Sequence, residues 1–349
     1  MRVEKIYHEP NVADWARGRE ILARFPDAKR VEVPSHWNIA GLHGDADGVG
    51  DWNRNKKTVL VLGTKKGLGI RSFYRSADFI APSQANGCAM ACSYCYVARR
   101  KGYANPITTF VNSGDILGAV ERHAARQGFK FEGTQADPDL WVYELGTNSD
   151  LSVDAAVSGN VRDAVGLFRG LPNAKATFAT KFVNRELLDY DPHRKTRLRF
   201  SLMPPEISTL VDVRTSPVER RIAAINDFVE AGYEVNLNFG PVIFEDGWLG
   251  DYAELFGMLD AALSPAAKAQ LAAEVIFLTH TEDLHNVNLS WHPEGEKALW
   301  RPDVQEHKTS QASGERVLRY ERNLKRGLVR ELRALILEKM PYCGIRYAF

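Results

Sequence analysis

Cys88-Ala89-Met90-Ala91-Cys92-Ser93-Tyr94-Cys95 is the stretch that decides how this chain is interpreted. It has the spacing C-x3-C-x2-C and holds three of the four cysteines among 349 residues, while Cys343 stands apart near the end. A disulfide framework needs cysteine pairs spread along the chain and an oxidising compartment. Three cysteines within eight residues instead predict a metal centre.

The spacing favours an iron–sulfur cluster over zinc. Three thiolates can hold three irons of a 4Fe–4S cluster, because thiolate is the usual ligand of such clusters. The fourth iron then has no protein ligand, so the amino and carboxylate groups of S-adenosylmethionine (SAM) can chelate it, and one electron releases a 5′-deoxyadenosyl radical. Structural zinc needs four closed ligands, and the nearest histidine downstream is His123. Zinc therefore stays as the weaker alternative.

The bulk composition is that of an ordinary globular protein. Hydrophobic residues make up 44% and charged residues 26% of the chain, which argues against disorder. No run approaches the roughly 20 apolar residues of a membrane span, and the charged start Met1–Lys5 lacks the apolar core of a signal peptide. We therefore expect a soluble cytoplasmic protein without a membrane partner. The formal net charge of +1 neither requires nor excludes nucleic acid.

From about residue 77 onward, short apolar runs alternate with helical patterns. The candidate strands are 78–81, 141–145, 176–180, 197–202, 234–239 and 274–279. The candidate helices are 114–127, 153–169, 184–189, 216–231 and 249–263. About six strand–helix units in series predict an α/β fold with a parallel sheet, open or closed into a partial barrel. The chemistry of such folds lies at the carboxyl ends of the strands.

This pattern divides the chain into three regions. Residues 1–76 are predicted to form an N-terminal extension on the barrel, with a helix at 20–25 and a strand at 58–62. Residues 77–283 form the predicted barrel. Residues 284–349 form a C-terminal region with a basic helical segment at 315–339, which carries eight basic and four acidic residues. One face of that segment has arginines at spacings of three or four, which suits either a solvated surface or contact with phosphates.

At this point the chain is identified as similar to a known family. The cysteine motif followed by Tyr96 resembles the radical SAM superfamily, whose fold is a partial (βα)6 barrel like part of a TIM barrel. Over nearly its whole length the chain resembles the spore photoproduct lyase family, which reverses a UV-induced thymine dimer in spore DNA. The matching stretches are Tyr7–Pro10, Cys92–Tyr96, Tyr143–Asp150, Thr180–Phe182, Arg199–Ser201, Ala231–Tyr233, Glu245–Trp248 and Arg319–Tyr320.

The resemblance implies roles for individual residues that bind the cofactors. The cluster ligands would be Cys88, Cys92 and Cys95. The residues that contact SAM from strand ends would be Ser149, Lys181 and Ser201. Lys181 on position alone suits a solvated lysine, and Ser149 with Asp150 equally suits the N-cap of the next helix.

The resemblance also implies roles in catalysis and substrate binding. Tyr96 would help to pass the radical back towards SAM, and Arg319 and Tyr320 would lie where the damaged duplex is opened, with Tyr320 able to stack on a base. The implied partners are DNA and a reducing electron donor such as flavodoxin or ferredoxin, and a monomer is expected.

One position departs from the family pattern. The family has a hydrogen-donating cysteine just before a Thr-Ser-Asp sequence, and here Thr147 precedes Asn148-Ser149-Asp150. A threonine O–H bond is much too strong to donate a hydrogen atom to a carbon radical. The only other cysteine is Cys343, which could serve only if the end of the chain folded over the barrel mouth. A radical SAM enzyme with another substrate, or a non-catalytic metal protein that binds nucleic acid, therefore stays open.

Two further polar features have ordinary structural explanations. Glu144 lies in a strand expected to be buried, so its carboxylate needs a polar partner. His280, His285 and His292 have spacings of no usual metal site and are predicted to be loop or hydrogen-bonded core histidines.

Overall fold

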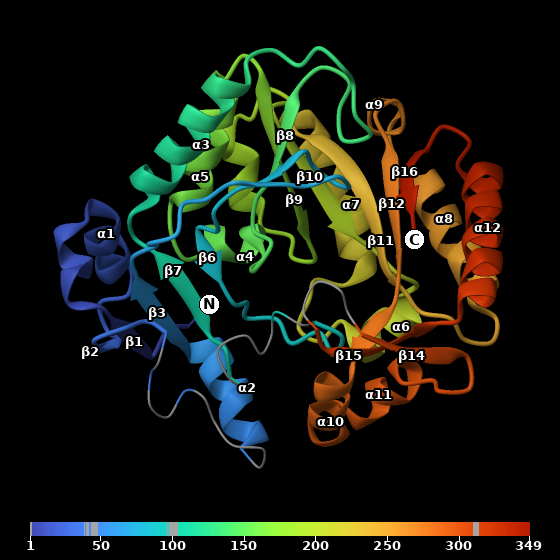
Figure 1. The fold of residues 1–349 in the computed structure, drawn as a ribbon, viewed down its shortest axis with the longest axis horizontal. Helices are drawn as coiled ribbons and strands as arrows, with labels where there is room; N and C mark the ends of the chain where they lie inside the picture. Colours follow the sequence, from blue (N-terminus) through green and yellow to red (C-terminus); the bar gives the residue numbers. More distant parts are fainter. Residues whose placement is uncertain are drawn as a thin grey trace. The chain divides into compact units, whose positions relative to one another are not determined.

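The computed structural model describes residues 2–37, 39, 42, 48–95, 97, 104–309 and 314–349 (Figure 1). The chain forms two compact units. The first consists of Met1–Met90, Val97–Leu198 and Glu230–Glu234, and the second of Ala91–Tyr96, Arg199–Val229 and Val235–Phe349. These boundaries differ from the three predicted regions, which stay a prediction.

The first unit contains a five-stranded sheet in the order β2-β1-β3-β7-β6. Its strands are β1 (Lys5–His8), β2 (Lys29–Glu32), β3 (Val59–Gly63), β6 (Ala85–Asn86) and β7 (Ile107–Phe110). All pairs are parallel except β6 with β7. The run Val-Leu-Val-Leu-Gly of β3 is buried throughout, as expected for a parallel strand covered on both faces. The helices beside it are α1 (Ala16–Arg24) and α2 (Val49–Thr58).

The first unit also contains the first half of the predicted strand–helix series. The strand order is β4 (Arg71–Ser72), β5 (Phe79–Ile80), β8 (Trp141–Glu144) and β9 (Ala174–Thr180), and β5, β8 and β9 are parallel. The helical elements are α3 (Ser113–Gln127), α4 (Leu151–Ala155), α5 (Asn160–Gly170) and the 3-10 helix η3 (Arg185–Tyr190). The single helix predicted at 153–169 is therefore two helices, because a turn at 156–159 separates α4 from α5.

Strand β10 (Thr196–Ser201) begins in the first unit and ends in the second. There the order is β10, β11 (Glu234–Val242), β12 (Ala272–Phe277) and β16 (Gly344–Ala348), with β11, β12 and β16 parallel. The helices are α6 (Pro205–Val211), α7 (Val218–Glu230), α8 (Trp248–Ala262) and α9 (Pro265–Lys268). Apolar ring contacts such as Phe200 with Phe228 and Phe239 with Phe256 fill the core between this sheet and its helices.

The C-terminal part of the second unit contains a small antiparallel sheet. Its elements are β13 (Thr279–Thr281), α10 (Glu282–Trp291), α11 (Pro293–Leu299), β14 (Gln305–Thr309), β15 (Arg316–Tyr320) and α12 (Arg322–Lys339). β15 lies between β13 and β14 and is antiparallel to both. Among the described helices, none is long and apolar enough to cross a membrane.

The helix predicted over 315–339 is wrong for residues 316–320. These residues form β15, in which Val317, Leu318 and Tyr320 are buried. Branched and aromatic side chains suit a strand, and pairing with β13 and β14 outweighs the helical spacing of the arginines. The rest of the segment is helical as predicted, with Leu328, Leu332 and Ile336 on its buried side.

Candidate active site

The predicted cluster motif is divided between the units. Cys88 belongs to the first unit, and Cys92 and Cys95 belong to the second. Within the described ranges, no group of three or more His, Cys, Asp or Glu side chains is arranged to hold a metal ion, so the ligand assignment rests on the cysteine spacing.

In the first unit, Gly87 sets the position of Cys88. Its φ of +83° is a conformation that favours glycine, and a Cβ there would lie 2.6 Å from the carbonyl oxygen of Pro106. Its amide donates a hydrogen bond of 2.8 Å to the carbonyl of Asn148. The half-buried thiol of Cys88 therefore follows directly on a contact with the loop that carries Thr147.

The same loop joins two of the predicted SAM-contacting residues. Asp150 caps α4 by accepting from the amides of Ser152 and Val153, which confirms the N-cap expected there. Its carboxylate also accepts from the Thr180 hydroxyl at 2.8 Å and from the Lys181 amide at 3.0 Å. Because Ser149 precedes Asp150, this one carboxylate fixes the half-buried Ser149 and Lys181 at the ends of neighbouring parallel strands.

Two buried carboxyl groups dominate the electrostatics of this loop. Burial raises the pKa of Asp150 against its hydrogen bonds to Lys181 and Thr180, and burial raises the pKa of Asp154 well above its usual range. The Ser149 hydroxyl donates to Asp154 Oδ2 at 2.6 Å, whereas Asp154 Oδ1 has no hydrogen-bond partner within the described part of the chain. An unsatisfied buried carboxyl oxygen of this kind fits a site that is completed by a ligand.

In the second unit, the cysteine loop is fixed by backbone contacts. The amides of Ala91 and Ser93 donate to the carbonyls of Val213 and Val211 at 3.0 and 2.9 Å. The side chain of Asn288 donates to the Ser93 carbonyl at 2.6 Å. A Cβ at Gly295 would lie 3.4 Å from Ser93 Oγ, so α11 approaches the loop closely. Cys92 is buried and Cys95 is half-buried.

Arg221 links the cysteine loop to Ser201. Its buried guanidinium donates to the Ser201 carbonyl at 2.6 Å and to Asp212 Oδ2 at 3.0 Å. Asp212 in turn accepts from the Tyr94 hydroxyl, and burial together with Asp212 raises the pKa of Tyr94 well above its usual range. Sequence reasoning missed Arg221, because an arginine on a helix gives no signal of burial.

Ser201 lies at the carboxyl end of β10, where the chemistry of such sheets is expected. It is buried, and its hydroxyl accepts from the Asn238 amide on β11 at 3.4 Å. Asn238 Oδ1 has no hydrogen-bond partner among the described residues. The end of β10 therefore presents a second acceptor that a ligand amino or hydroxyl group can complete.

The histidines after β12 are hydrogen-bonded around one carboxylate. Glu296 contacts His280 Nε2 at 3.0 Å, His285 Nδ1 at 2.6 Å and the amide of Asn288 at 2.7 Å. His285 also stacks on Trp300 with ring centroids 3.9 Å apart. Burial lowers the pKa of His292 to about 4. The group therefore supports α10 and α11, and through Asn288 it supports the cysteine loop.

The remaining predicted residues fall into three cases. Tyr96 lies outside the described residues. Arg319 is exposed, whereas Tyr320 is buried and its hydroxyl accepts from the Phe244 amide, so the ring is not at the surface for stacking on a base. Cys343 is buried immediately before β16, whose first residue pairs with Ala272 at the start of the parallel strand β12. It thus lies at the amino end of these strands, opposite the end where the chemistry is expected.

Comparison with known proteins finds one matching family and several relatives of this chain. The family model described as spore photoproduct lyase matches residues 1–349. Relatives named spore photoproduct lyase include one from Bacillus subtilis (strain 168), 28% identical over 274 residues (78% of this chain and 77% of the relative), and one from Clostridium acetobutylicum, 27% identical over 291 residues (83% and 82%).

Solved structures agree in fold. A spore photoproduct lyase mutant with bound AdoMet and dinucleoside spore photoproduct, and the lyase complexed with dinucleoside spore photoproduct, each have a TM-score of 0.88 at 24% identity, with 99% of both chains covered. This likeness confirms the predicted α/β fold, a partial TIM-like barrel of the radical SAM type. Since the family model matches every residue, the chain belongs to the spore photoproduct lyase family.

Proposed function

We propose that this protein is a radical SAM enzyme that acts on a UV-induced pyrimidine lesion in DNA. The observation that carries the proposal is the hydrogen bond from Gly87 to Asn148, because it joins the segment of the first cluster cysteine to the loop of Thr147 and Ser149. Family membership over the full chain and relatives that bind AdoMet and the dinucleoside lesion support the same reading.

The donor sets present fit both cofactors. Three thiols at C-x3-C-x2-C spacing suit three irons of a 4Fe–4S cluster, and Cys88 and Cys95 are half-buried rather than sealed. The unsatisfied side-chain oxygens Asp154 Oδ1 and Asn238 Oδ1 lie beside two of the proposed SAM contacts, Ser149 and Ser201. Lys181 is the third contact. When bound, the cluster and SAM supply a 5′-deoxyadenosyl radical that abstracts hydrogen from the substrate.

The protein's own part is to position these groups. Asp150 holds the loop of Ser149 against the end of β9, and Arg221 holds the end of β10 and the cysteine loop through one guanidinium. Groups fixed in this way need no reorganisation when charge or radical character develops. Tyr96 is proposed to return the radical towards SAM, and Arg319 to contact the DNA.

Thr147 makes the last step of the proposed reaction different from that of the family pattern. Its hydroxyl is a poor hydrogen-atom donor, and Cys343 lies at the wrong end of the strands. We infer that the hydrogen atom for the product radical comes from a donor other than a cysteine of this chain. This departure favours, as a second candidate function, a radical SAM reaction on a substrate that is not nucleic acid.

The deciding experiment measures SAM cleavage by anaerobically reconstituted, dithionite-reduced protein, with 5′-deoxyadenosine quantified with and without UV-irradiated DNA. Stimulation by irradiated but not by intact DNA supports the proposal, and Cys92→Ala should abolish cleavage. Cleavage indifferent to DNA would favour the second candidate. No cleavage despite intact cluster absorbance would leave only a non-catalytic metal protein.

The cellular setting follows from the proposed reaction. The protein needs a reducing electron donor such as flavodoxin or ferredoxin and is proposed to work as a monomer in the cytoplasm. A reducing system purified from the same cytoplasm should replace dithionite as the source of electrons for SAM cleavage.

A further inference from the structure

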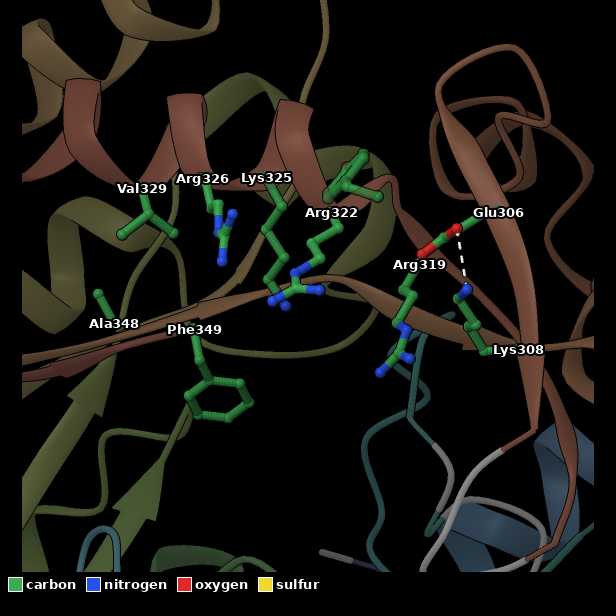
Figure 2. Close-up of a pocket in the computed structure, with 10 residues that line it drawn as sticks. Glu306, Lys308, Arg319, Arg322, Lys325, Arg326, Val329, Ala348 and Phe349 are labelled. Atoms are coloured by element: carbon green, nitrogen blue, oxygen red, sulfur yellow. Dashed lines mark ion pairs between the residues drawn. The ribbon is translucent and has the colours of Figure 1, made fainter.

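A hollow of about 760 Å³ lies in the second unit between strands β14 and β15, the start of α12 and the end of β16 (Figure 2). Five cationic side chains line it, namely Lys308, Arg319, Arg322, Lys325 and Arg326. Figure 2 shows the side chains of Arg322, Lys325 and Arg326 extending from one side of α12 toward the ring of Phe349.

Most of the charged side chains around the hollow are cationic. Five of its lining side chains are cationic and one is a carboxylate, and that carboxylate, Glu306, is already paired with Lys308 at 3.0 Å (Figure 2). Arg319, Arg322 and Arg326 have no acidic partner among the described residues. Because Arg322 and Arg326 lie four residues apart on one helix, they repel each other. An anion bound between the two guanidinium groups removes this repulsion.

The location ties the hollow to the end of the sheet where the chemistry is expected. Arg319 pairs with Thr279, which follows the end of β12. The carbonyl of Phe349 accepts from the amide of Phe277 at 2.8 Å. The hollow therefore opens at the carboxyl ends of β12 and β16, on the same edge as Ser201 at the end of β10.

The lining specifies the chemical class of the ligand. Guanidinium groups bind phosphate oxygens through paired N–H donors, and the N-terminus of the 18-residue helix α12 adds a favourable dipole. The ring of Phe349, with Lys325 Nζ at 5.6 Å from its centroid, and the side chain of Val329 supply an apolar wall. Cations beside an aromatic ring suit a nucleotide, with its phosphate on the arginines and its sugar or base on the ring.

We propose that this hollow binds a backbone phosphodiester of the DNA strand that flanks the lesion, with Arg322 and Arg326 as the phosphate ligands. The inference rests on the proposed function, since it takes DNA as the substrate. It assigns these two arginines to the strand outside the two lesion nucleosides. The lesion nucleosides and the DNA strand that flanks them are thus bound by different residues.

The test compares Arg322→Gln/Arg326→Gln with Arg220→Gln/Arg330→Gln, which removes the same charge from exposed positions outside the hollow. Binding of a fluorescein-labelled single-stranded oligonucleotide is followed by anisotropy at several salt concentrations. The hollow variant should bind roughly tenfold or more weakly. Its log–log salt slope should fall in magnitude by about 0.7 to 1.4, since each phosphate contact on a single strand contributes about 0.7. A hollow variant whose affinity and slope match those of the charge control would overturn the proposal.

A second measurement separates this proposal from the proposed function. The ratio of kcat/KM for a lesion-containing oligonucleotide to that for the dinucleoside lesion, which has no flanking phosphates, should fall about tenfold in the hollow variant and stay unchanged in the charge control. An equal loss on both substrates would contradict a flanking-phosphate site. If the wild-type protein turns over neither substrate, but the hollow variant still binds more weakly than the charge control, the proposed function is contradicted and the phosphate site remains supported.

Competition by inorganic phosphate separates a DNA phosphodiester from free phosphate. Phosphate that competes with the oligonucleotide no better than chloride at equal ionic strength supports a DNA phosphodiester. Strong competition would identify a site for free phosphate and overturn the assignment.

Discussion

The side-chain amide of Asn288 donates to both the backbone carbonyl of Ser93, at 2.6 Å, and the carboxylate of Glu296, at 2.7 Å. Ser93 lies between Cys92 and Cys95, so an asparagine almost 200 residues away fixes the backbone of the proposed cluster ligands. Glu296 is itself held by His280 and His285.

Asn288→Ala should therefore loosen the cysteine loop before it affects the rest of the fold. Loss of a buried hydrogen bond of this type costs about 1–3 kcal/mol. We expect less iron per chain after anaerobic reconstitution and faster loss of iron to a chelator, measured by cluster absorbance. Asn226→Ala is the matched control, since Asn226 donates to the Ala262 carbonyl far along the chain from the cysteines. Equal iron retention in the two variants would contradict the role of Asn288.

A buried ion-pair group in the first unit predicts sensitivity to acid. Glu234 pairs with Arg197 and Lys175, and Lys175 also contacts Asp137 at 2.7 Å. Although burial opposes ionisation, these two cations lower the pKa of Glu234 from 4.5 to about 2. A lowered carboxyl pKa stabilises the fold above the unfolded pKa, and this contribution disappears as the pH falls from about 4.5 to about 2.

Glu234→Gln should remove this contribution and leave two cations under-compensated. We expect a loss of about 3–5 kcal/mol at pH 7, since one member of a buried group is lost. The difference in melting temperature from wild type should shrink in acid. The exposed Glu219→Gln should melt like wild type at each pH. A constant gap between Glu234→Gln and wild type down to about pH 2 would refute the linkage.

Asp154 should respond to pH in the opposite direction. Burial raises its pKa well above the usual range, so the folded state holds a proton that the unfolded state releases. The contribution of Asp154 to the free energy of unfolding therefore falls as the pH rises from its pKa in the unfolded state to its pKa in the folded state. Asp154→Asn, which keeps the shape but not the charge, should gain stability relative to wild type between pH 5 and pH 8, by about 1 kcal/mol or more. Thermal melts at the two pH values check this, and the exposed Asp189→Asn should show no such trend.

Thr147→Cys tests the hydrogen donor. A thiol at this position, in the loop whose Asn148 carbonyl accepts from the Gly87 amide, should return a hydrogen atom to the product radical and raise the amount of repaired product per 5′-deoxyadenosine. Thr147→Ser keeps the hydroxyl and should behave like wild type. Product analysis by mass spectrometry separates the two, and an unchanged product ratio in Thr147→Cys would show that position 147 is not within reach of the radical.

The sequence indicates the strand–helix series and the cysteine motif because both depend on local patterns. Strands β8 to β12 lie within a few residues of their predicted positions, and Glu144 has the partner it needs in Ser76 at 2.7 Å. β15 could not be predicted in the same way, since its arginines at 316 and 319 continue into Arg322 of α12 at the spacing of a helix. Its pairing strands come from 279–281 and 305–309.

Two residues of the candidate site could also not be predicted from local sequence patterns. Gly87 is required because the carbonyl of Pro106 comes within 2.6 Å of its absent Cβ, and the sequence does not reveal that approach. Arg221 resembles a surface residue of an amphipathic helix, but its partners Ser201, Ser216 and Asp212 enclose it completely. Long-range contacts decide both positions.

The guanidinium of Arg221 also constrains how this family member can change over generations. Because the side chain of Tyr94 reaches this guanidinium through Asp212, and the side chain of Ser208 binds it directly, a substitution at Tyr94 changes the cost of a substitution at Ser208. Replacements that are each tolerated singly would then be harmful together. The two positions should drift as a pair rather than independently, even though more than a hundred residues of chain separate them.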